Sequence, residues 1–97
     1  MLVVTGTVTA RPETLDALRE AALAHVARSR VEPGCLMHSV HADCENPLRL
    51  FFYEEWADRR ALDEHFARAG SAAFMKSVRE LAADSTRIRI LPVAPRA

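Results

Sequence analysis

The chain has 97 residues, of which 49% are hydrophobic and 27% charged, and its 13 basic and 13 acidic residues cancel. These values are typical of one small globular domain, here residues 1–97, and they argue against a disordered chain. A neutral chain has no electrostatic reason to bind nucleic acid or an anionic membrane, so we expect neither as a partner.

The N-terminal residues and the cysteines bear on where the protein works. Residues 1–5 lack the basic start, the apolar run and the cleavage site of a secretory signal. No apolar stretch approaches the roughly 20 residues that a membrane span needs. Cys35 and Cys44 are too far apart for a disulfide if a strand separates them, and two thiols do not make a structural zinc site. We therefore expect a cytoplasmic protein with two reduced cysteines.

The first predicted elements are a strand and a long helix. Residues 2–10 alternate between two faces and are rich in β-branched side chains, which predicts a strand. Pro12 suits the first turn of a helix, and apolar residues then recur at helical spacing. The sequence Val-Glu-Pro-Gly at 31–34 ends this helix, because the residue before a proline avoids the α region. The predicted buried stripe of the helix is Leu15, Leu18, Ala22, Val26 and Ser29.

A predicted antiparallel hairpin follows. Residues 35–42 and 48–56 alternate as strands, and the polar sequence at 43–47 is typical of a turn. On the second of these strands, Glu54 and Trp56 share a face. That strand is apolar or aromatic on both faces, so both sides of the predicted sheet require cover.

Two short helices are predicted after the hairpin. Asp58 is a suitable N-cap for the first, which carries His65 on its apolar face. The sequence Ala-Gly-Ser at 69–71 interrupts the helical pattern. Ser71 can then cap the second helix, which we expect to end at residues 84–85.

A last strand is predicted over residues 86–93. Pro92 and Pro95 mark its end and make it an edge strand, because proline cannot donate a hydrogen bond to a neighbouring strand. The predicted order is therefore βαββαβ, which is typical of an α+β, ferredoxin-like fold with helices on one face of a four-stranded antiparallel sheet. The other apolar face then needs a second copy of the chain, and we expect a two-fold homodimer.

Three short motifs resemble the antibiotic biosynthesis monooxygenase family. Residues 32–35 read Glu-Pro-Gly-Cys after the first helix, residues 54–56 read Glu-Glu-Trp at the end of the third strand, and residues 61–65 read Ala-Leu-Asp-Glu-His on the next helix. The motifs occur in the family's order and on the matching elements. The resemblance covers about residues 3–93.

This resemblance implies a dimeric α+β barrel with a mostly apolar cavity between the sheet and the helices of each subunit. It also implies a cofactor-independent monooxygenase that oxidises a quinol or a hydroxylated polycyclic aromatic with molecular oxygen, without metal or flavin. The substrate is then its own reductant, so the protein need only remove a proton, fix the ring and exclude water. The sequence departs from the family where relatives carry a tyrosine and this chain has His38, and where many carry a second histidine before Phe74 and this chain has Ala73.

His65 and His38 are the predicted catalytic residues. His65 lies on the inward face of its helix, where an imidazole can accept a proton near neutral pH, and Glu54 is its expected partner. His38 takes the family's pocket-facing tyrosine position and could orient or deprotonate a phenol. Two alternative interpretations remain: His65 could be a histidine packed in the core, and its pair with Glu54 could serve only to hold the helix in place. The predicted substrate-binding residues are Trp56, Phe52, Glu54 and Phe74, which are core side chains if there is no cavity.

The remaining histidines are given no role. His25 falls at the margin of the first helix's stripe and is interpreted as a boundary residue. His38 and His41 lie on opposite faces of their strand and cannot bind one metal ion together. The family resemblance implies that the protein needs no metal and no other cofactor.

Three other functions remain open from the sequence. The first is a non-catalytic dimeric module that binds a small ligand, and the second is an isomerase or decarboxylase of aromatic breakdown, which uses the same equipment of a base in a dry pocket. Haem degradation by a neighbouring branch of the superfamily is disfavoured, because the chain has no histidine after His65 and no asparagine before Asn46. Motifs of metalloproteases, nucleotide-binding proteins and serine hydrolases are absent.

Overall fold

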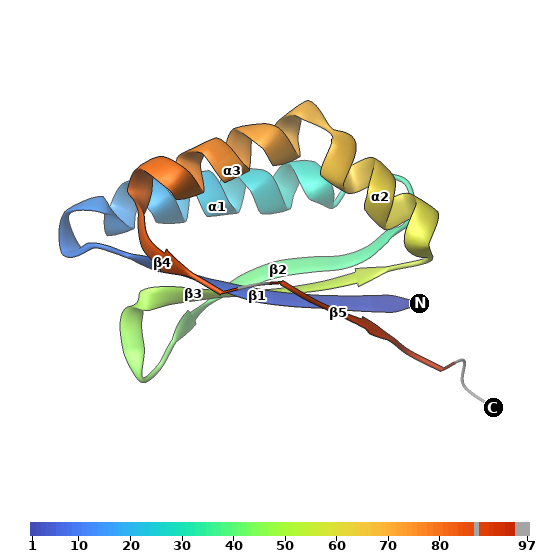
Figure 1. Ribbon diagram of the computed structural model, residues 1–97, viewed down its shortest axis with the longest axis horizontal. Coiled ribbons are helices and arrows are strands. Elements are labelled where there is room, and N and C mark those ends of the chain that lie inside the picture. Colours follow the sequence, from blue (N-terminus) through green and yellow to red (C-terminus); the bar gives the residue numbers. More distant parts are fainter. Residues whose placement is uncertain (87, 95–97) are drawn as a thin grey trace.

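The computed structural model describes residues 1–86 and 88–94 and places helices over one face of an antiparallel sheet (Figure 1). This is the predicted α+β, ferredoxin-like architecture. The elements in chain order are β1 (Leu2–Ala10), the 3-10 helix η1 (Pro12–Thr14), α1 (Leu15–Ser29), β2 (Cys35–Asp43), β3 (Asn46–Trp56), α2 (Arg59–Ala67), α3 (Ala69–Leu81), β4 (Ala82–Ser85) and β5 (Arg89–Pro92).

The sheet has the order β2-β3-β1-β4, and β5 also pairs with β1. All its pairings are antiparallel, and one row across the centre joins Val4 of β1 to Glu54 of β3 and Glu54 to His38 of β2. Residues paired in this way point to the same face of a sheet. The row therefore directs the side chains of Glu54 and His38 toward the helices.

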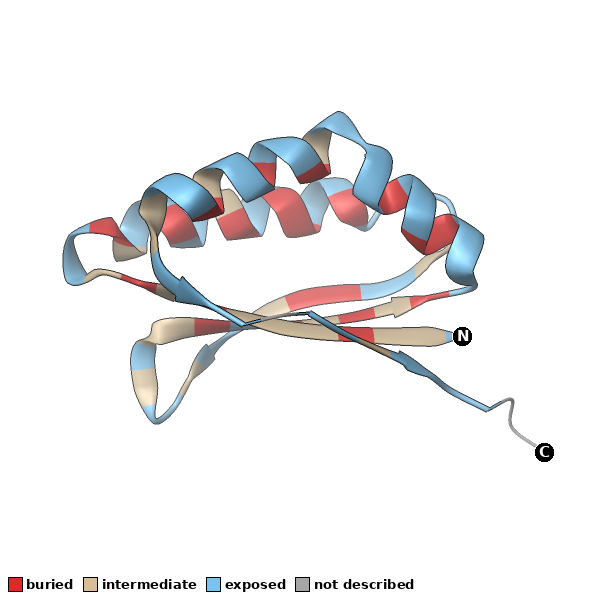
Figure 2. Ribbon diagram, viewed as in Figure 1, coloured by how far each residue is buried: buried red, intermediate tan, exposed pale blue. Residues whose placement is uncertain are grey.

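The buried residues recur along the helices and in the strands of the sheet that the helices cover (Figure 2). The stripe that the sequence predicted on α1 is confirmed, with Leu18 and Ala22 fully buried. The core consists of two apolar clusters. The larger is Val8, Ala10, Leu18, Ala22, Val26, Leu50, Phe52, Phe74 and Val78, and the smaller is Val4, Trp56, Ala61 and Leu62.

The prediction of one last strand over residues 86–93 was wrong. Helix α3 ends at Leu81, and the chain enters β4 directly at Ala82. Strand β4 pairs with β1 at residues 8–10, where the register shifts between Thr9 and Ala10, and β5 pairs with β1 at residues 2–5. The two short strands thus pair in succession along one edge of β1. Position 87 and Pro95 lie outside the described residues.

The junction of α2 and α3 differs in part from the prediction. Asp58 caps α2 as expected, because its carboxylate accepts a hydrogen bond from the Ala61 amide at 2.9 Å. Ser71 does not cap α3, which begins two residues earlier at Ala69. Its hydroxyl instead donates to the His65 carbonyl at 2.6 Å and ties the end of α2 to α3. Within the part of the chain that the structure describes, no helix has the length and apolar character of a membrane span.

Candidate functional site

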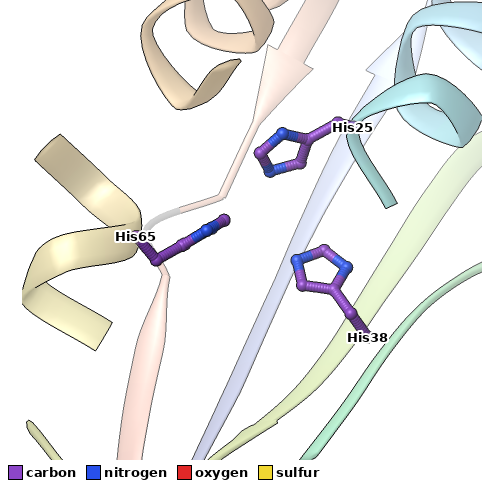
Figure 3. A group of neighbouring side chains, drawn as sticks. All are labelled: His25, His38 and His65. Carbon is purple, nitrogen blue, oxygen red and sulfur yellow. The ribbon is translucent and has the colours of Figure 1, made fainter. Parts of the chain in front are cut away.

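Three of the chain's four histidines meet beneath the helices. His25 comes from α1, His38 from β2 and His65 from α2, and their rings point toward one another (Figure 3). The ring centres lie 5.4 Å apart for His25 and His38, 5.3 Å for His25 and His65, and 5.7 Å for His38 and His65. All are buried, with relative exposures of 6%, 1% and 2% in chain order. We refer to His25, His38 and His65 as the histidine cluster.

The interpretation of His25 as a boundary residue was wrong. His25 follows Leu18 by seven residues, which is about two helical turns, so it lies on the same buried stripe of α1. Its ring stacks on Phe74 of α3 at 4.6 Å with an interplanar angle of 8°. The helical spacing contained this signal, but the sequence alone did not identify the partners across the fold. By contrast, His41 is exposed on the outer face of β2, as its alternation with His38 predicted.

His65 is oriented by a carboxylate that the sequence did not pair with it. Its Nδ1 lies 2.9 Å from Oε1 of Glu32, which also contacts Arg68 at 3.2 Å. The expected partner Glu54 instead contacts His38, because the sheet register places these two residues side by side on the face covered by the helices. When Nδ1–H donates to a carboxylate, the neutral ring keeps a lone pair on Nε2. The imidazole of His65 is therefore arranged to accept a proton at Nε2.

Glu54 is held as a buried carboxylate. It accepts a hydrogen bond from Trp56 Nε1 at 2.9 Å, and its Oε1 lies 3.3 Å from Nε2 of His38. Burial alone would raise the pKa of Glu54, but the contacts with His38 and Trp56 and the charge of nearby His65 outweigh burial and hold that pKa below its ordinary value. The site thus contains a negative charge next to the histidine cluster.

Several ring nitrogens of the histidine cluster have no hydrogen-bond partner among the described residues. They are Nδ1 of His25 and both ring nitrogens of His38, whose 3.3 Å contact with Glu54 lacks hydrogen-bond alignment. Burial, followed by the proximity of His38 and His65, lowers the pKa of His25 from 6.5 to about 4. A buried polar atom without a partner costs about 1–3 kcal/mol of stability. The folded chain therefore keeps this cluster at a cost.

A cavity of about 310 Å³ opens beside the cluster. His25, Glu54 and His65 lie in its wall, and most of the remaining surface is apolar. The cavity is lined by Gly6, Thr7, Val8, His25, Phe52, Glu54, His65, Phe66, Ser71, Ala72, Phe74, Met75, Val78, Ser85, Thr86 and Ile88. Such a space, apolar with a few convergent polar groups, is typical of a small-molecule site.

Four of the six predicted site residues line this cavity, namely His65, Phe52, Glu54 and Phe74. The other two, His38 and Trp56, lie outside its wall. Trp56 is fully buried, and its ring lies 4.5 Å from that of His65 with an interplanar angle of 34°. His38 contacts Glu54 and faces the other two histidines. Both are placed to position the cavity residues, while the roles of all six stay predictions.

Comparisons with known proteins bear on the family and the fold of the chain. The sequence model of the family described as antibiotic biosynthesis monooxygenase matches residues 1–77. A crystal structure from Deinococcus radiodurans, proposed to be such a monooxygenase, superposes with a TM-score of 0.93 over 100% of this chain and 96% of that chain, at 24% identity. PA3566 from Pseudomonas aeruginosa is 30% identical and superposes with a TM-score of 0.85 over 96% of this chain and 94% of that chain. At 24% identity the first match shows the fold alone.

A sequence relative is the protein sll1783 of Synechocystis. It is 29% identical to this chain over 93 residues. The match covers 96% of this chain but 63% of the relative, so the chain spans less than two thirds of that protein's length.

Proposed function

The chain belongs to the antibiotic biosynthesis monooxygenase family, and from this premise we propose that it is a cofactor-independent monooxygenase acting on a quinol or a hydroxylated polycyclic aromatic. The observation that carries the proposal is the position of His65. Its Nδ1 is fixed by Glu32, and its ring lies in the wall of an apolar cavity of about 310 Å³. A positioned base in a dry pocket is the equipment that oxidation of an electron-rich phenol requires.

In the proposed reaction, Nε2 of His65 accepts a proton from a phenol or from an activated methylene of the substrate. The resulting anion passes electrons to molecular oxygen. At an activated methylene, one oxygen atom becomes the new carbonyl oxygen and the other leaves as water with the two hydrogens of the methylene. The substrate supplies all the electrons, so the balance requires no other reductant.

The size and apolar lining of the cavity support a small aromatic substrate. Its volume lies near the lower end of the roughly 300–1,000 Å³ that is usual for small-molecule sites, which suits a single ring or a few fused rings. Phe52 and Phe74 supply aromatic surface for these rings. Glu54, also in the wall, stabilises positive charge on the imidazole of His65 after proton transfer.

His38 and Trp56 are proposed to act through the residues that they contact. His38 lies next to Glu54, and Trp56 donates to the same carboxylate while its ring lies against that of His65. Their substitution should therefore alter turnover by misplacing Glu54 and His65.

A homodimer is part of the proposal. The helices cover one face of the sheet, and the opposite face carries Met37, Phe51 and Leu91 with exposures of 46%, 37% and 39%. A second copy packed on this face would remove these side chains from water. Analytical ultracentrifugation should give a mass twice that of one chain. The substitution Phe51→Asp should lower the measured mass toward that of the monomer.

Oxygen consumption with a panel of hydroquinones and anthrones tests the proposed reaction. We expect the wild-type chain to consume oxygen with at least one member of the panel. His65→Ala should lower kcat by about 100-fold or more, since it removes the base. His65→Gln, which fills the space without a basic nitrogen, should lower it similarly, and His38→Phe should lower it less.

Glu20→Ala is the control, because Glu20 is exposed on α1, away from the cavity wall and from the proposed dimer face. Turnover that is indifferent to His65→Ala and His65→Gln would contradict the proposed base. Binding of the aromatics without any oxygen consumption would instead support a small-ligand-binding module.

A further inference from the structure

The proposed oxidation needs one base, yet the fold brings three imidazoles together. They come from three separate elements, all are more than nine-tenths buried, and one nitrogen of each lies within 4.8 Å of the others. His38 has two ring nitrogens and His25 one that are buried without a partner among the described residues. A proton acceptor at His65 alone leaves these nitrogens unexplained.

We propose that His25, His38 and His65 form a binding site for a single divalent transition-metal ion of the Zn²⁺ type. Three imidazoles on a tetrahedral ion, with metal–nitrogen bonds of about 2.0–2.1 Å, have ring centres about 5 Å apart. The observed separations of 5.3, 5.4 and 5.7 Å are close to this value. Rotation of the side chains, without a change of the backbone, would bring the three nitrogens from within 4.8 Å to the roughly 3.4 Å that such an ion requires.

The carboxylates around the histidine cluster also favour the binding of a metal ion. A histidine that binds a metal ion commonly donates its other N–H to a carboxylate, and Glu32 accepts from Nδ1 of His65 in this way, which leaves Nε2 for the ion. Glu54 adds a buried negative charge 3.3 Å from His38. Imidazole donors suit zinc, copper, nickel and iron, whereas magnesium and calcium prefer oxygen donors. No metal was expected from the sequence, because the family resemblance implies none and His25 was interpreted as a boundary residue.

Metal binding and proton transfer compete for the same lone pair. A nitrogen bound to an ion cannot accept a proton, so the ion would stop any reaction that uses Nε2 of His65 as its base. This inhibition rests on the proposed function, whereas the binding of the ion does not. The chain would then catalyse the proposed oxidation when it is free of metal, and zinc would inhibit it.

Titration of the EDTA-treated chain with Co²⁺ tests the site by absorption spectroscopy and needs no substrate. All chains carry Cys44→Ser, so that this exposed thiol cannot bind the ion. We expect one Co²⁺ per chain, with the intense visible bands of tetrahedral coordination, and displacement by Zn²⁺. His25→Phe should weaken binding by about 100-fold or more, and Glu32→Gln by about 10- to 100-fold.

His25→Phe is chosen because phenylalanine keeps the stacking on Phe74. Circular dichroism should show that this variant is folded. His41→Phe, a histidine substitution on the exposed face, should change the affinity by less than about twofold. Equal binding of Co²⁺ by the wild type and His25→Phe, or no tetrahedral spectrum, would overturn the metal site. Oxygen consumption by the EDTA-treated chain is a separate measurement, so either proposal can fail while the other stands.

Discussion

The larger apolar cluster and the histidine cluster both lie between the helices and the sheet, but their side chains make different kinds of contact. In the larger apolar cluster, Leu18 and Ala22 of α1 are fully buried against other apolar groups. One turn further along the same helix, His25 is also buried, but its Nδ1 has no hydrogen-bond partner among the described residues. The ring of His25 stacks on Phe74 of the larger cluster, and the ring of His65 lies at a tilt against Trp56 of the smaller one, so the histidine cluster lies between the two apolar clusters.

This difference distinguishes the side chains that stabilise the fold from the side chains that could bind a ligand. Burial of apolar surface lowers the free energy of the folded chain, whereas buried polar atoms without partners raise it. Polar groups kept at such a cost are expected at functional sites. Substitutions in the two clusters should therefore have effects of different size and, in one case, of opposite sign.

The largest effect is expected in the larger apolar cluster. Leu18→Ala should lower the free energy of unfolding by about 4 kcal/mol, because the fully buried side chain leaves a cavity. For a chain of this size, that loss lowers Tm by roughly 20 °C. Chemical denaturation measures it, and Leu23→Ala is the control, since Leu23 lies on the same helix with 54% exposure. A loss below about 1 kcal/mol would show that Leu18 is not part of the packed core.

The next effect is a pH dependence that belongs to His25. Its pKa is about 4 in the folded chain and 6.5 for the free side chain, so the unfolded chain binds more protons between these values. Stability should then be fully present above pH 6.5 and fall as the pH decreases toward 4, by up to about 3 kcal/mol.

The difference between the wild-type and His25→Phe unfolding curves over this pH range isolates the contribution of His25. The groups that influence its charge are His38, His65, Glu54 and Arg28. Parallel curves for the two chains between pH 6.5 and 4 would contradict the depressed pKa.

A smaller loss is expected when His65 loses its carboxylate. Glu32→Ala leaves Nδ1 of His65 buried without its acceptor and should cost about 2 kcal/mol. Thermal unfolding at pH 7.5 measures this change. The control is Glu20→Ala, which removes an exposed glutamate from α1 and should change stability by about 0.5 kcal/mol or less. Equal effects of both substitutions would mean that the contact with Glu32 does not hold His65.

The smallest effect, and the one of opposite sign, is expected for His25→Phe at pH 7.5. Phenylalanine keeps the stacking on Phe74 and removes the unpaired Nδ1. Replacing a buried polar atom without a partner by carbon should leave stability unchanged or raise it by about 1 kcal/mol. A clear loss of stability would indicate that His25 has a structural partner.

The elements and the apolar core could be predicted from sequence because both depend on local spacing. The period of β1 gave its bounds, Leu2–Ala10, without error, and the stripe on α1 gave the buried face. The last strand was misplaced because its division into β4 and β5 depends on pairing with β1, which local alternation does not encode.

The site could be predicted only in part, because its contacts join distant residues. His65 was identified from its helix and its motif, and it does lie in the cavity wall. Its partner Glu32 is 33 residues away, and the short motif that contains Glu32 does not indicate a contact with His65. The meeting of His25 with His38 depends on how α1 packs over the sheet. Such packing is a property of the whole fold, which periodicity along the chain does not reveal.

The most direct test of this account is a crystal structure of the chain soaked with a hydroxylated aromatic, such as an anthrone or a hydroquinone. We predict that the ring lies in the cavity against Phe52 and Phe74, with a hydroxyl or the activated carbon within hydrogen-bond reach of Nε2 of His65. A ring bound elsewhere, or a cavity that stays filled by its own side chains at saturating ligand, would contradict the account.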